Sequence, residues 1–102
     1  MASPYTVARA KHATMAAAST VETVTLTDLA TKRGEIEVLN RDGAAAIFFT
    51  TDGSTPTVNG DNCWVIPAAV GSLIVKSPAD LAGVVKLISA GTPQYSVQGQ
   101  VL

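Results

Sequence analysis

The stretch EIEVLNRDGAAAIFFTT, residues 35–51, decides the fold. Its first part alternates acidic with apolar side chains, which predicts a strand that turns Ile36 and Val38 inward and both glutamates, Glu35 and Glu37, to solvent. The Asp-Gly pair at 42–43 has the chemistry of a tight turn. The last seven residues are the most hydrophobic segment of the chain, which predicts a central strand covered on both faces.

Short β-type segments of the same kind continue on both sides of this stretch, separated by turns that contain glycine or proline. Together they give about seven strands spaced roughly ten residues apart, at residues 21–27, 35–40, 45–51, 63–67, 71–76, 84–89 and 95–100. No apolar periodicity of helical length follows residue 20. The pattern predicts an all-β fold, a single Ig-like antiparallel β-sandwich.

The first twenty residues differ from the rest. They are rich in alanine, serine and threonine, and they offer no apolar stripe that would dock a helix. We therefore expect an extended N-terminal arm over residues 1–20 and a sandwich domain over residues 21–102. Arg9 and Lys11 lie in the arm without any acidic residue, which favours contact with an acidic surface. Tyr5 has no local core to join, which favours a role as an anchor in a partner.

The composition of the chain limits the classes of partner that it can bind. The chain has 102 residues, a net charge of −1 and five aromatic residues in all, so its core contains few large side chains. We expect neighbours in an assembly to stabilise such a small domain, and hence a homo-oligomer, for which a trimer is one arrangement. The charge gives no drive toward nucleic acid. No apolar run approaches the roughly 20 residues of a membrane span or forms the core of a signal peptide.

The long polar segment at 52–62 and the tryptophan behind it are the candidate binding elements of the sandwich. Asp52, Asn59, Asp61 and Asn62 could give oxygen ligands to calcium, but Asx residues beside glycine are also what turns require, and turns are the favoured interpretation. Trp64 has three interpretations: a core residue beside the two phenylalanines, which we favour, a platform for a sugar, or an anchor for a partner.

Catalytic chemistry finds no support in the sequence. A catalytic nucleophile would need a base, and His12, the sole histidine, lies in the arm, where a solvated or subunit-contacting residue is the favoured interpretation. Cys63 stands in an apolar run, where it is interpreted as a small buried hydrophobe. Phosphate-loop and metal-binding motifs are absent from the sequence. We therefore expect a protein without enzymatic activity and without a cofactor.

One part of the chain resembles known families. The run AIFFTTDGSTPT, residues 46–57, resembles a hairpin of Ig-like accessory domains in bacterial glycoside hydrolases of the chitobiase type. It also resembles small virion proteins of tailed bacteriophages, particularly those of actinobacterial hosts. The phage likeness extends through residues 58–68 and into residues 85–97, so that it covers about residues 35–98.

The phage resemblance implies a structural role in the virion, after synthesis in the host cytoplasm. It implies a capsid decoration protein whose arm and sandwich bind the major capsid protein or another virion protein. The partner-binding candidates are then Tyr5, Arg9, Lys11, Asp52, Asn59, Asp61 and Trp64. A tail or neck component is an alternative of the same class. A carbohydrate-binding Ig-like module, which would use Trp64 and the polar loop, is an alternative of a different class.

Overall fold

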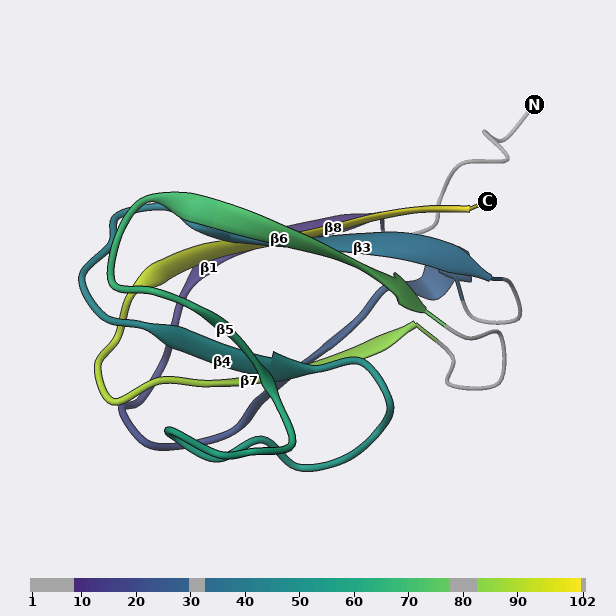
Figure 1. Ribbon diagram of the computed structural model, residues 1–102. Helices are drawn as coiled ribbons and strands as arrows, with labels where there is room; N and C mark the ends of the chain where they lie inside the picture. The colour runs from purple at the N-terminus through teal and green to yellow at the C-terminus, as the bar shows by residue number, and fades with distance from the viewer. Residues whose placement is uncertain (1–8, 30–32, 78–82, 102) are drawn as a thin grey trace.

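The computed structural model describes residues 9–29, 33–77 and 83–101 (Figure 1). These residues form a single-turn 3-10 helix, η1 (Thr27–Leu29), and eight strands. The strands are β1 (Ala10–Thr14), β2 (Glu22–Thr25), β3 (Gly34–Asn40), β4 (Ile47–Thr50), β5 (Trp64–Ile66), β6 (Gly71–Ser77), β7 (Val84–Ile88) and β8 (Gln94–Val101). No described helix is long and apolar enough to cross a membrane.

The strands form two four-stranded sheets that lie face to face (Figure 1). Sheet A has the order β1-β8-β3-β6 and sheet B the order β2-β7-β4-β5, and every pairing is antiparallel. Among the described strands, β4 and β5 alone follow each other within one sheet, and every other connection passes between the sheets. The expected antiparallel β-sandwich is confirmed.

Strand β3 lies at the centre of sheet A, with β8 on one side and β6 on the other. Its residues alternate strictly between buried and half-buried positions, as the sequence predicts. Ile36 and Val38 are fully buried, whereas Glu35 and Glu37 lie on the outer face. The predicted orientation of this strand is therefore confirmed.

Strand β4 is buried along its whole length, between β7 and β5 of sheet B. Ile47 and Phe49 belong to the core between the sheets. Phe48 alternates with them and faces away from sheet A, yet it is 8 % exposed. In Figure 1 the segment between β4 and β5 runs along this outer side of sheet B, and its Pro56 is buried. The loop therefore covers the second face of β4, as expected for a central strand.

The structure corrects the extent of the N-terminal arm. Residues Ala10–Thr14 form β1, which pairs along its whole length with β8. Met15 is buried, and its backbone N–H donates to the carbonyl of Pro93 at 3.0 Å. The small side chains of this segment give no pattern that predicts a strand. The segment becomes a strand because it pairs with the backbone of β8, which is far away in the sequence. Tyr5 lies outside the described residues.

Asn40 joins the turn after β3 to the segment after β5. It is fully buried, and its Nδ2 donates to the carbonyls of Ala45 at 2.8 Å and Pro67 at 3.1 Å. Its Oδ1 accepts the backbone N–H of Gly43 at 3.0 Å. Gly43 has a φ of 67°, and a Cβ there would lie 2.9 Å from the backbone of Ala69. The predicted Asp-Gly turn is therefore present and is held by a buried amide.

A second buried polar contact connects the two sheets. Tyr95 on β8 is fully buried, and its hydroxyl donates to Oε2 of Glu22 on β2. The other carboxylate oxygen of Glu22 accepts the backbone N–H of Ala16 at 3.1 Å. Burial, followed by the hydrogen bond and the charge of Glu22, raises the pKa of Tyr95. The carboxylate of Glu22 on sheet B is therefore hydrogen-bonded both to sheet A and to the β1–β2 connection.

Candidate functional site

A groove of about 220 Å³ lies beside β5 and β6, the last strands of their sheets. We call it the Trp64 groove. It contains an indole, hydroxyl groups, an amide, a carboxylate and an ammonium group, from Thr50, Thr51, Asp52, Asn62, Trp64 and Lys76. Two of the predicted partner-binding residues, Asp52 and Trp64, therefore meet in one place.

Trp64 is exposed because β5 ends its sheet. It lies opposite Phe49 in the register of β4 and β5. Phe49 is fully buried between the sheets, whereas Trp64, one strand further out, is 53 % exposed. The favoured interpretation of Trp64 as a core residue is wrong. The residues around Trp64 are typical of a buried strand, and Trp64 is exposed only because β5 is the last strand of its sheet.

Asp52 is held by the turn that follows β4. Its Oδ1 accepts the backbone N–H of Ser54 at 3.0 Å and also the Ser54 hydroxyl. These hydrogen bonds hold the pKa of Asp52 below its usual value. Thr50 donates from its hydroxyl to the Ser54 carbonyl at 2.6 Å, and Lys86 donates to the Gly53 carbonyl at 3.2 Å. The carboxylate therefore enters the groove charged and fixed in place.

The rest of the polar loop is built as a series of turns. Asn62 lines the groove and donates to the carbonyl of Thr55 at 3.1 Å, while Asn59 has a φ of 60°. Cys63 is half-buried, and its thiol lies 3.4 Å from the carbonyl of Thr57. The turn interpretation fits these contacts. Asn59 and Asp61 are exposed and do not line the groove, and no three His, Cys, Asp or Glu side chains within residues 9–29, 33–77 and 83–101 could hold a metal ion together.

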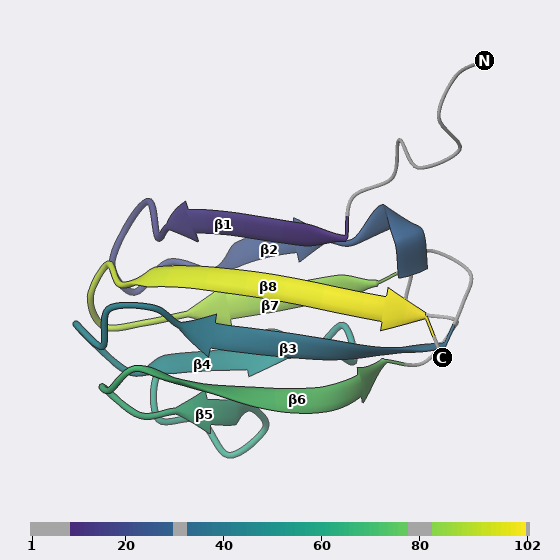
Figure 2. The same cartoon turned by 90° about the horizontal axis from the view of Figure 1, so that it is seen from above.

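The basic candidates lie at the opposite side of the sandwich. Lys11 is on β1, the first strand of sheet A, and Arg9 directly precedes that strand. Figure 2 shows β1 and β2 at one side and β5 and β6 at the other. His12 on β1 makes a hydrogen bond from Nδ1 to the hydroxyl of Ser96 over 2.6 Å. Four of the predicted binding residues therefore lie at two opposite edges: Asp52 and Trp64 at one edge, Arg9 and Lys11 at the other.

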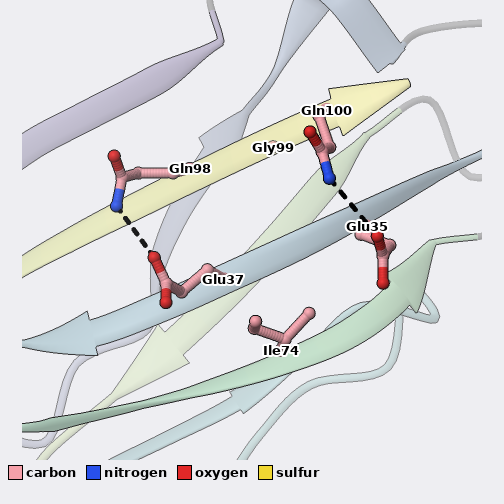
Figure 3. Close-up of a pocket in the computed structure, with 6 residues that line it drawn as sticks. All are labelled: Glu35, Glu37, Ile74, Gln98, Gly99 and Gln100. Carbon is pink, nitrogen blue, oxygen red and sulfur yellow. Dashed lines mark hydrogen bonds between the residues drawn. The ribbon is translucent and has the colours of Figure 1, made fainter. Parts of the chain in front are cut away.

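The outer face of sheet A forms a second, more open groove of about 230 Å³ (Figure 3). Its glutamates are each bonded to a glutamine of the neighbouring strand: Gln98 donates to Glu37 at 3.0 Å and Gln100 donates to Glu35 at 3.3 Å. The hydroxyl of Ser72 donates to the other oxygen of Glu37. These carboxylates are acceptors in a cross-strand ladder, which suits a polar surface better than a catalytic base.

Sequence reasoning missed half of the Trp64 groove. Lys76 comes from β6, and nothing near it in the sequence connects it with Trp64. Thr50 ends the buried strand β4 and Thr51 directly follows it, which makes both residues inconspicuous in the sequence. An indole beside fixed charges and hydroxyls can stack on a flat ligand or anchor a protein loop. No protein-family model, curated protein or solved structure matches this chain.

Proposed function

We propose that this chain is a non-enzymatic structural protein of a phage virion, a capsid decoration protein that binds the major capsid protein. The resemblance of residues 35–98 to small virion proteins supports the class. The observation that carries the proposal is Trp64, which is half-exposed beside the charges of Asp52 and Lys76. Tryptophans in such partly enclosed positions dominate the binding energy of many protein interfaces.

The two groups of candidate residues support contact with more than one neighbour. The Trp64 groove lies at the β5–β6 edge, and Arg9 and Lys11 lie at the β1 edge. A small domain that touches two neighbours on a shell gains affinity from each contact, because the second contact forms at high local concentration. We therefore expect the domain to bind two neighbouring shell proteins, one through the basic β1 edge and the other through the Trp64 groove.

The class of protein can be tested on particles made by the phage genome that encodes the chain. Quantitative mass spectrometry of purified particles should find the chain at a copy number comparable with that of the major capsid protein. Immunogold labelling should decorate the whole head. A copy number close to that of a ring of neck or tail subunits, with label confined to the tail, would favour the tail or neck alternative. Absence from the particles would contradict both.

Trp64→Ala is expected to weaken attachment to undecorated heads by about tenfold or more, because it removes the aromatic anchor. Stability should change little, since the side chain is half-exposed. Sedimentation of the added chain with heads measures attachment, and circular dichroism checks the fold. Val70→Ala is the matched control, because Val70 is 70 % exposed and does not line the groove. Equal attachment of both variants would show that the groove is not the anchor.

The same groove favours one candidate from another class, a carbohydrate-binding module. Exposed indoles stack on sugar rings, and Asp52 with Asn62 could bind sugar hydroxyls. A glycan array separates the two functions. Binding of the wild type to a defined glycan, lost in Trp64→Ala, together with absence of the chain from particles, would favour the carbohydrate module. No glycan binding together with head attachment would favour decoration.

A further inference from the structure

Strand β6 differs from the other three strands that end a sheet. It has seven residues, whereas β5 has three and is followed by Pro67, and β2 has four. Strand β1 has five residues, four of them exposed and none of them large and apolar. Short length, proline and polar side chains are the usual protection of an edge against further pairing. Strand β6 has only one charged residue, Lys76, and carries an exposed isoleucine at its centre.

We infer that β6 pairs with β6 of a second copy of this chain, antiparallel and related by a two-fold axis at Ile74. Ile74 is the middle residue of Gly71–Ser77 and is 58 % exposed. With the axis there, Ile74 lies opposite Ile74 of the second copy. Leu73 lies opposite Val75 of the second copy, so that apolar residues also match on the inner face. The two A sheets then become one continuous eight-stranded sheet.

The charges on the outer face fit the same register. Lys76 of one copy lies opposite Ser72 of the other, and no like charges face each other across the two strands. The hydroxyl of Ser72 donates to Oε2 of Glu37 at 3.1 Å. Each ammonium group is therefore brought beside a hydroxyl that is already bonded to a carboxylate. The symmetry makes this contact twice, and it would bring unlike charges together at both ends of the pairing.

Exposed apolar side chains are concentrated on β5, on β6 and on the connection between them. Of the five large hydrophobic residues exposed within the described part of the chain, four lie between positions 64 and 74: Trp64, Val65, Val70 and Ile74. Lys76 lines the Trp64 groove from β6, so the grooves of the two copies lie beside the joint. Because an isologous pairing closes with two copies, the expected assembly is a dimer. The inference does not depend on the virion proposal.

Disulfide trapping tests the register. In a Cys63→Ser background, Ile74→Cys should give a covalent dimer under mild oxidation, because paired residues of antiparallel strands have Cα atoms about 4.5–5.5 Å apart, within disulfide range. Ser72→Cys is the matched control. Its two copies would lie four residues apart along the strands, about 13 Å, and should not be linked. Linking of Ser72→Cys as rapid as that of Ile74→Cys would overturn the register.

Sedimentation of the purified chain tests the dimer itself. The wild type should sediment as a dimer, and Ile74→Lys should be monomeric, because two ammonium groups would face each other on the axis. Val101→Lys, which changes another exposed apolar residue, should remain dimeric. A wild type that is monomeric at every concentration would overturn the inference. A monomeric wild type would not contradict the decoration proposal, and absence of the chain from particles would not contradict the dimer.

Discussion

Asn40→Leu is expected to lower the free energy of unfolding by about 3 kcal/mol, because three backbone groups lose the partner that the fully buried Asn40 amide supplies. Leucine has a similar size but cannot donate to the carbonyls of Ala45 and Pro67 or accept from Gly43. These groups lie where the β3–β4 turn packs on the segment after β5, so the loss of the amide weakens the contact between the two segments. Urea unfolding should show a lower midpoint with an unchanged slope.

Asn62→Leu is the matched control for this experiment. Asn62 is exposed, and its amide makes one hydrogen bond, to the carbonyl of Thr55. The carbonyl can turn to water when the amide is lost, so the change in stability should be within about 0.5 kcal/mol. If Asn40→Leu were as stable as Asn62→Leu, the buried amide would not be what holds the turn.

The parts of the fold that the sequence predicts are those with local signals. The alternation of Glu35, Ile36, Glu37 and Val38 determines which face of β3 is buried, since a shift by one residue would bury both glutamates. The apolar run at 45–51 predicts a strand covered on both faces, and glycine marks the turn at Gly43. In each case, side chains near one another in the sequence are enough to decide the structure.

The parts that the sequence does not predict depend on distant backbone. Ala10–Thr14 carries no apolar periodicity and becomes a strand because β8 offers an open edge. Trp64 has the neighbours of a core residue, but β5 is the last strand of its sheet. The order of strands in a sheet also decides that Lys76 meets Trp64 and Asp52. The place of Lys76 in the Trp64 groove could thus be found only with the sheet order known.

The contact between Tyr95 and Glu22 should make the stability of the protein depend on alkaline pH. The folded protein raises the pKa of Tyr95 above its ordinary value of 10.0, because burial and the Glu22 charge disfavour the phenolate. The unfolded chain therefore loses this proton first. The contribution of Tyr95 is fully present below pH 10 and is lost as the pH rises further. The free energy of unfolding should fall above pH 10.

Tyr95→Phe separates the stability that the hydrogen bond contributes at neutral pH from the stability that the wild type loses at alkaline pH. At neutral pH it should cost about 2 kcal/mol, because a half-buried carboxylate that ties both sheets loses its donor. Above pH 10 the difference from the wild type should shrink, since only the wild type loses further stability through this group. In a Tyr5→Phe background, Tyr95 is the sole tyrosine, and its phenolate absorbance should appear only as the protein unfolds. If the phenolate formed near pH 10 while the fold stayed intact, burial and the contact with Glu22 would not raise the pKa of Tyr95.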